Sequence, residues 1–324
     1  MDRRRFLQTV AAGGIGAFAS LHFTEDGLSA TPEEKIIPKR PFGETGEQLS
    51  IIGLGGVVVI RMQQPEVNNL ISEVIDRGVN YVDVAPTYGG GKAEELLGPA
   101  LKGYRDKIFL ACKTTKRKKE EAFAELRQSL TRLKTDHFDL YQFHAISNMQ
   151  DVETIFSEGG AVEAFEEAKE QGLIKHIGFS AHSAKAALAA MDRFDFDSIL
   201  FPISFALYYK ENFGPQVVEK AKEKGVARLA IKAMAKNRWP KDADRNEFPN
   251  CWYQPVSDPT TASMALRFTL SQPITAAVPP GDPKLFRMAM EIASQITPIT
   301  EVEKEELKKI AQNQSEESIF KLDV

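Results

Sequence analysis

Short apolar runs alternate with helical patterns along most of the chain, from about residue 50 to residue 292. Apolar runs of a few residues predict buried strands, whereas apolar residues at three- and four-residue intervals predict amphipathic helices. The strands are expected at Ile51–Leu54, Tyr81–Asp83, Ile108–Lys113, Phe138–His144, Ile174–Ser180, Ser198–Ile203, Ala227–Ile231 and Ala276–Val278. The helices are expected at Glu66–Arg77, Glu94–Leu101, Glu120–Leu133, Val162–Glu170, Ala184–Met191, Val217–Lys224, Thr261–Leu270 and Leu285–Ile292. Eight strand–helix units over about 250 residues are typical of an α/β fold with a parallel sheet closed into a (β/α)8 TIM barrel.

Further elements are predicted on both sides of this repeat. Phe42–Gly46 has the turn chemistry of a hairpin, so an N-terminal β-hairpin is expected to cap the barrel. Glu301–Gln312 predicts an additional, charged helix near the C-terminus. Residues 31–40 contain two prolines and several charges and are interpreted as a linker. Residues 41–324 are interpreted as one barrel domain.

The first residues have the pattern of an export signal. Arg3–Leu7 reads Arg-Arg-Arg-Phe-Leu, and the apolar stretch that follows, Thr9–Leu21, is too short to span a bilayer. The pattern resembles a twin-arginine signal peptide within residues 1–30, with cleavage expected near Ala19 or Ala30. The twin-arginine translocase is therefore an expected partner, and the mature protein is expected in the periplasm without a stable membrane anchor. A basic tail or an organellar transit peptide is the alternative interpretation.

The composition argues against several classes of function. The formal net charge is −4, so the chain lacks the basic excess with which proteins bind nucleic acid. Two cysteines are too few for a disulfide framework or for a four-cysteine metal site. The five histidines include neither an H-x-H pair nor an H-E-x-x-H motif. We therefore expect no metal and no nucleic-acid partner, and we expect a small-molecule substrate.

Polar residues end four consecutive strands of the predicted barrel. They are Asp83, Lys113, His144 and Ser180, separated by 30, 31 and 36 residues, which is one strand–helix unit each time. The carboxyl ends of barrel strands meet at one face, where the active sites of such barrels lie. We therefore expect these side chains to converge at the barrel mouth.

The same residues could reduce a carbonyl group. Negative charge that develops on the carbonyl oxygen during hydride transfer needs a proton donor and electrostatic support. Tyr88 lies just beyond Asp83 and is the expected acid; a neighbouring Lys113 ammonium is expected to lower its pKa. Asp83 would keep Lys113 charged and in place, and His144 would orient the substrate oxygen.

Several motifs together resemble the aldo-keto reductase family. Tyr81–Gly89 is similar to the family's Asp-x-Ala-x-x-Tyr-Gly motif and is followed by Glu94–Gly98, as in the family. Ala111–Thr114, Asp139–His144 and Ile177–Ser180 match its lysine, histidine and fifth strands. The resemblance covers residues 40–312. It implies an NAD(P)H-dependent oxidoreductase with the catalytic tetrad Asp83, Tyr88, Lys113 and His144.

The resemblance also implies a set of cofactor-binding residues for NADP(H), with NAD(H) as the alternative. They are Ser180, Ser204, Gly281, Lys284, Arg287 and Glu291. Arg287 falls where the family often places an arginine on the adenosine 2′-phosphate. This half of the pattern departs from the family: Ala181 stands in place of an asparagine, and Leu200 and Ser204 replace a glutamine and an asparagine.

Other functions stay open on the sequence alone. The substrate could be an aldehyde, a ketone or a sugar-like molecule, and the oligomeric state is undetermined. An exported nicotinamide-binding sensor without turnover is one alternative, and a sugar-modifying enzyme that recycles a tightly bound NADP(H) is another. The aromatic residues of Asn237–Ser257 could either line a substrate pocket or hold that connection against the barrel. His182 is expected to cap the helix that follows it.

Overall fold

Eight parallel strands form the centre of the molecule in a computed structural model, which describes residues 36–323. The barrel strands are β3 (Leu54–Gly55), β4 (Tyr81–Asp83), β5 (Phe109–Thr114), β6 (Phe138–Ile146), β7 (Ile174–Ala181), β8 (Ser198–Pro202), β9 (Ala227–Ile231) and β12 (Ala276–Val278). Each pairs with the next along the chain, and a bridge between Ile52 and Ala277 joins the two edge strands. The predicted (β/α)8 barrel is confirmed.

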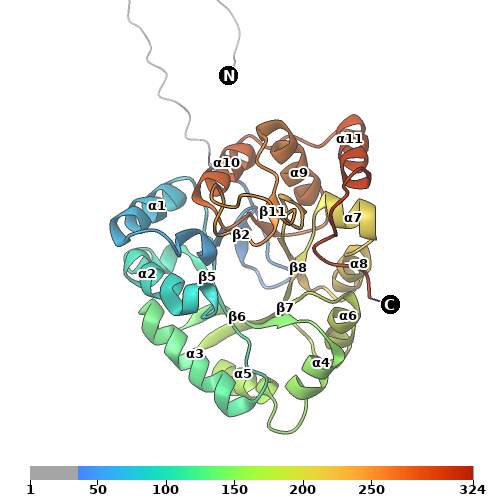
Figure 1. Ribbon diagram of the computed structural model, residues 1–324. Coiled ribbons are helices and arrows are strands. Elements are labelled where there is room, and N and C mark those ends of the chain that lie inside the picture. The colour runs from blue at the N-terminus through green and yellow to red at the C-terminus, as the bar shows by residue number, and fades with distance from the viewer. Residues whose placement is uncertain (1–35, 324) are drawn as a thin grey trace, which may run out of the picture. The chain divides into compact units, whose positions relative to one another are not determined.

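Helices surround this barrel in a ring (Figure 1). They are α1 (Gln64–Asp76), α2 (Lys92–Leu101), α3 (Lys119–Leu133), α4 (Met149–Ile155), α5 (Ala161–Glu170), α6 (Ala184–Arg193), α7 (Phe205–Glu211), α8 (Pro215–Glu223), α9 (Pro259–Ser271), α10 (Pro283–Ser294) and α11 (Glu301–Gln312). Helices α4 and α7 were not predicted, because each has only seven residues and is too short to show apolar residues recurring at helical spacing. No helix within residues 36–323 has the length and apolar character needed to cross a membrane.

The helices form where an apolar stripe follows a capping residue. In α10, the Asp282 side chain accepts hydrogen bonds from the amides of Lys284 and Leu285, and Pro283 occupies the first turn. Leu285, Phe286, Ala289, Met290 and Ala293 then recur at helical spacing and are buried. The cap satisfies amides that have no partner inside the helix, and the apolar stripe packs the helix on the barrel.

A hairpin closes the amino-terminal end of the barrel, as predicted. It consists of β1 (Lys39–Pro41) and β2 (Gln48–Ser50), paired antiparallel. Between them, Phe42 is fully buried and its ring lies 4.9 Å from that of Phe109 inside the barrel. Part of the segment interpreted as a linker belongs to the folded barrel domain, because Ile37 is buried. The predicted signal peptide lies outside the described residues.

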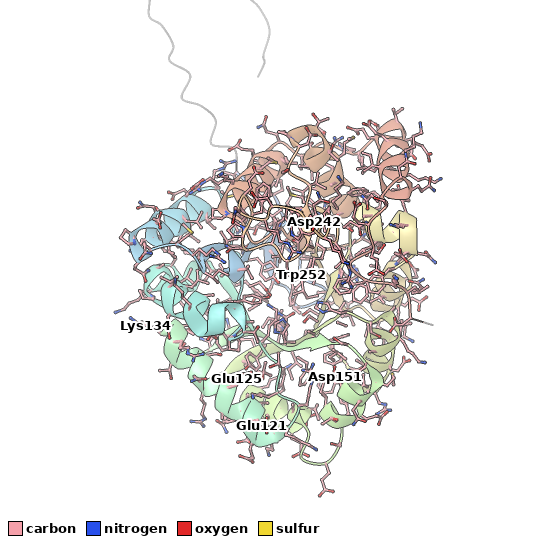
Figure 2. All side chains as sticks on the ribbon, in the orientation of Figure 1. Glu121, Glu125, Lys134, Asp151, Asp242 and Trp252 are labelled. Carbon is pink, nitrogen blue, oxygen red and sulfur yellow. The ribbon has the colours of Figure 1, made fainter. Side chains whose placement is uncertain are left out.

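The long connection after β9 contains a small hairpin, β10 (Ala235–Asn237) paired with β11 (Gln254–Pro255). The aromatic residues of this connection separate into two groups. Phe248 and Trp239 pack with Cys251 against Leu285 of α10 and hold the connection to the barrel. Trp252 is 52% exposed, and in the view of Figure 2 it lies inside the ring of helices. The interpretation that aromatic residues hold this connection against the barrel is confirmed for Phe248 and Trp239, and a substrate-pocket role for the others stays a prediction.

Candidate active site

The Lys113 ammonium, on β5, is at the centre of the site. It forms an ion pair with the Asp83 carboxylate at the end of β4. It also donates hydrogen bonds to the Val84 carbonyl and to the Tyr88 hydroxyl, both at 3.2 Å. The side chains of Lys113 and Asp83 are 0% and 2% exposed. A buried charge needs close, well-oriented partners, so these contacts fix the three segments relative to one another.

The chain after β4 turns sharply and brings Tyr88 over Lys113. Tyr88 begins a short 3-10 turn, Tyr88–Gly91, in which Gly89 and Gly90 have φ of 62° and 66°. Glycine adopts this left-handed conformation at little cost, which is the local reason for the glycine run. The turn leads directly into α2. The Tyr88 ring packs edge-on against the His144 ring, with 5.9 Å between centroids.

Opposing effects set the pKa of Tyr88. Burial raises the pKa of the phenol, the Lys113 ammonium lowers it, and the net pKa is above the ordinary value. Lys113 therefore lowers the pKa of Tyr88 as predicted, but burial, which the sequence prediction left out, raises that pKa by more. Burial also lowers the pKa of Lys113, but Asp83 and Tyr88 more than offset this and raise it. At neutral pH the phenol and the amine are both protonated.

Two residues hold the backbone around His144 in place. Arg117 donates a hydrogen bond of 2.7 Å to the His144 carbonyl, and the Ser180 hydroxyl accepts one of 2.7 Å from the Ala145 amide. Ala145 has a φ of 55°, a conformation that a residue with a side chain adopts only under such restraint. Burial, followed by the Lys113 charge, lowers the pKa of His144 well below its usual range, so the imidazole is neutral.

Two partners of Asp83 were not predicted as site residues. The Tyr81 hydroxyl and the Gln142 amide each donate to its second carboxylate oxygen at 3.2 Å. Their positions follow from strand periodicity: Tyr81 lies two residues before Asp83 on β4, and Gln142 is in register with Lys113 on the neighbouring strand. Inward-facing positions recur every second residue along a strand, and this signal could have identified both.

Three of the predicted cofactor residues have roles in the fold itself. Ser180 holds the Ala145 amide, and Ser204 caps α7 by accepting a hydrogen bond of 3.3 Å from the Leu207 amide. Gly281 precedes α10, and a Cβ atom there would lie 2.4 Å from a methyl of Val57. Gly281 therefore permits a close approach of two loops at the mouth.

The remaining three cofactor residues follow one side of α10. Lys284 and Arg287 are exposed and one turn apart, an arrangement that can hold a phosphate group. Arg287 forms an ion pair of 2.8 Å with Glu73 of α1, and Glu291 forms one of 2.7 Å with Arg77. Asp282 already occupies the first amides of α10, so phosphate recognition here would depend on the two cationic side chains. The residues fit a 2′-phosphorylated nucleotide, with Glu73 competing for Arg287.

A second lysine at the mouth was also not predicted. Lys232 is the first residue after β9, and it lies as close to the end of its strand as Lys113 does. A lysine directly after an apolar run is the feature of the sequence that could have identified it as a mouth residue. Its ammonium lies 5.0 Å from the centre of the Trp252 ring and 4.7 Å from that of Tyr253. His182, after β7, stacks on Phe320 at 4.7 Å. Ser183, not His182, caps α6, since its side chain accepts from the Ala186 amide.

A large hollow lies at the other end of the barrel. It has a volume of about 770 Å³ and includes Arg40, Arg228 and Arg267 on its walls, whereas none of the tetrad residues contributes to it. These arginines donate to backbone carbonyls nearby and have structural roles. The described part of the chain has no group of three or more histidine, cysteine or acidic side chains that could hold a metal ion. The chemistry of the side chains therefore identifies the mouth around Lys113 as the site.

Comparison with known proteins identifies the family of this chain. The aldo/keto reductase family model matches residues 51–265. Over 312 residues the chain is 26% identical to the uncharacterized oxidoreductase YqkF of Bacillus subtilis, covering 87% of this chain and 98% of that protein. The holo form of the aldo-keto reductase AKR11C1 from Bacillus halodurans has a TM-score of 0.66 at 24% identity, over 85% of this chain and 96% of that one.

A second solved structure supports the same fold. It is an aldo/keto reductase from Klebsiella pneumoniae in complex with NADP and acetate, with a TM-score of 0.65 at 20% identity over 89% of this chain and 100% of that one. The family model spans more than half of this chain, and its range includes all four residues of the tetrad. The chain therefore belongs to the aldo/keto reductase family of NAD(P)H-dependent oxidoreductases.

Proposed function

We propose that this enzyme reduces the carbonyl group of an aldehyde, a ketone or a sugar-like substrate with NADPH, and that Tyr88 is the general acid. The observation that carries this proposal is the contact of 3.2 Å between the buried Lys113 ammonium and the hydroxyl of the partly buried Tyr88. The raised pKa of Tyr88, caused by burial, keeps the phenol protonated at neutral pH, as a proton donor requires.

Each residue of the site has a defined task in this reaction. NADPH, when bound, supplies the hydride. Tyr88 donates its proton to the carbonyl oxygen, and the Lys113 ammonium stabilises the phenolate that remains. Asp83 holds Lys113 in position, and the N–H of the neutral His144 donates a hydrogen bond to the carbonyl oxygen of the substrate without contributing a charge. Arg117 and Ser180 fix the backbone that carries His144.

The preference for NADP(H) is supported by two observations. The similar Klebsiella pneumoniae enzyme was solved in complex with NADP. In this chain, Lys284 and Arg287 present two positive charges on one exposed side of α10, next to the loop that contains Gly281. A dianionic 2′-phosphate suits such a pair, whereas the 2′-hydroxyl of NADH would gain little from it.

The substitution Tyr88→Phe tests the proposed acid. It keeps the ring against His144 and removes only the hydroxyl, so kcat for carbonyl reduction should fall about 10²–10⁴-fold, the usual contribution of a general acid. The dissociation constant of NADPH, measured by fluorescence, should stay the same. Tyr104→Phe, at the opposite end of the barrel, is the matched control and should have wild-type kcat. Near-normal turnover of the Tyr88 variant would exclude this residue as the acid.

We further propose that the protein is exported by the twin-arginine route and acts in the periplasm. The support is the Arg-Arg-Arg-Phe-Leu sequence at residues 3–7, followed by a weakly apolar stretch. Replacing Arg3 and Arg4 together by lysine keeps the positive charge and should leave the unprocessed protein in the cytoplasm, as fractionation and immunoblotting would show. Replacing Arg5 alone by lysine is the control and should not affect export. Unchanged export of the double variant would rule out this route.

A further inference from the structure

Lys232 is held at the barrel mouth in an unfavourable backbone conformation. It directly follows β9, and its φ is 69°, in the left-handed region that residues with a side chain rarely adopt. Strain of this kind persists where the surrounding structure requires it, and it is concentrated at functional sites. The turn is fixed by a hydrogen bond of 2.8 Å from the Ala235 amide to the Lys232 carbonyl.

Two aromatic rings hold the Lys232 side chain between them. The ammonium lies 5.0 Å from the ring centre of Trp252 and 4.7 Å from that of Tyr253, both on the connection after β10. Attraction to the ring faces favours the charged form and limits the positions that the ammonium can take. Tyr253 is in turn packed with Ala235 and Ile319, so at least one side of this clamp is rigid.

No carboxylate of the described chain pairs with Lys232, although the side chain is largely buried. Burial, and secondarily the Lys113 charge, lower its pKa to about 8. The neighbouring groups that respond to its charge are His144 and His182, both neutral because burial lowers their pKa values. Lys232 therefore adds a positive charge to the same part of the mouth as Lys113 and the two imidazoles, and within residues 36–323 no carboxylate forms an ion pair with it.

We propose that Lys232 binds a carboxylate of the substrate, so that the preferred substrates are oxo acids whose carbonyl lies at Tyr88 and His144. This inference rests on the proposed reductase function and deepens it. One compact ammonium between two aromatic faces matches the single charge of a carboxylate on an otherwise apolar molecule. The diphosphate of the cofactor is the other anion that reaches a barrel mouth, but it carries more charge and is bound best by several donors together.

The experiment compares acid and ester forms of the same aldehyde. The probes are 2-, 3- and 4-carboxybenzaldehyde and their methyl esters, which place the carboxylate at different distances from the carbonyl. For at least one isomer, wild-type kcat/KM should favour the acid. In Lys232→Met that preference should fall about tenfold through KM, the size expected for losing one charge-assisted contact, while ester turnover and NADPH affinity stay unchanged. Lys232→Arg should recover part of the preference, and Lys236→Met is the matched control.

Binding without turnover separates this inference from the proposed reaction. Benzoate and methyl benzoate are titrated against the holoenzyme, with intrinsic fluorescence as the readout, because Trp252 adjoins Lys232. Benzoate binding that is lost in Lys232→Met supports the carboxylate site even if no aldehyde is reduced. Two results would overturn the proposal. The first is an equal response of acid and ester to the substitution. The second is a weaker NADPH affinity in Lys232→Met, which would assign the charge to the cofactor diphosphate instead.

Discussion

The two halves of the barrel mouth use their polar side chains differently. In the half built by β4, β5 and β6, Lys113 contacts both Asp83 and Tyr88 directly, and Lys113 and Asp83 are shielded from water. In the half built by β7 to β12, Ser180 and Ser204 bond to backbone amides, and Arg287 and Glu291 on the adjoining α10 pair with α1. Lys232 differs from the other cations of that half, since its contacts are aromatic rings.

This difference reflects two kinds of demand on a side chain. Proton transfer needs a donor, an acceptor and a stabilising charge within hydrogen-bond distance, so the first half is fixed by its own internal contacts. Binding of a large cofactor or an anionic substrate distributes its energy over many contacts, so residues of the second half can be engaged elsewhere until a ligand arrives. Substitutions in the first half should accordingly have large effects on stability and kcat. Substitutions in the second half should have smaller effects on cofactor affinity and on kcat/KM.

The largest expected effect follows from Lys113→Met. It leaves the Asp83 carboxylate, 2% exposed, without its cation, and an uncompensated buried charge costs about 3–5 kcal/mol of unfolding free energy. Carbonyl reduction should fall by about 10²-fold or more, because the phenolate left after proton transfer loses its counter-charge. Urea denaturation and steady-state kinetics measure the two effects.

The double variant Lys113→Met with Asp83→Asn separates stability from catalysis. The neutral amide oxygen can still accept hydrogen bonds from Tyr81 and Gln142, so most of the lost stability should return. Activity should not return, since no cation faces Tyr88. Recovery of activity together with stability would mean that Lys113 acts on the fold and not on the reaction.

A smaller effect is expected where α10 meets α1. Arg287→Ala should weaken NADPH binding by about 1–3 kcal/mol, the range for losing a charge-assisted hydrogen bond, and leave NADH binding unchanged. Glu73→Gln should do the reverse and tighten NADPH binding by up to about 1 kcal/mol, because it releases Arg287 from an exposed ion pair. Equal losses for both cofactors in Arg287→Ala would give this arginine a structural role.

The smallest effect concerns the pH dependence of substrate choice. Lys232 has a pKa of about 8, because burial and the Lys113 charge lower it. It is protonated and attracts a carboxylate below that pH, and it loses the charge above it. The acid-to-ester ratio of kcat/KM should therefore fall about tenfold from pH 7 to about pH 10.

Other groups around Lys232 titrate outside this range. Burial holds the pKa values of His144 and His182 below it and those of Tyr253 and Cys251 above it, that of Cys251 at about 12. The acid-to-ester ratio of Lys232→Arg should be constant across the same range, since arginine stays charged. A fall of the same size in that variant would assign the transition to another group.

Residue order alone was enough to predict the barrel and the polar residues that meet at its mouth. Strands at Tyr81–Asp83, Ala227–Ile231 and Ala276–Val278 have the predicted bounds, because each is a buried apolar run that ends at a clear polar or turn residue. The parallel order of strands then brings Asp83, Lys113 and His144 to one face whatever the details of packing. The sequence was therefore sufficient to predict that these side chains lie together.

The tertiary structure decided the pKa values and the contact partners of the residues at the mouth. Burial outweighs the Lys113 charge at Tyr88, and no sequence pattern gives the depth at which a phenol lies. The pairing of Arg287 with Glu73 and the clamp of Trp252 and Tyr253 on Lys232 join residues far apart in the chain. Periodicity reports which face of an element is buried, whereas partners, exposure and pKa depend on what packs against that face, and only the folded chain determines this.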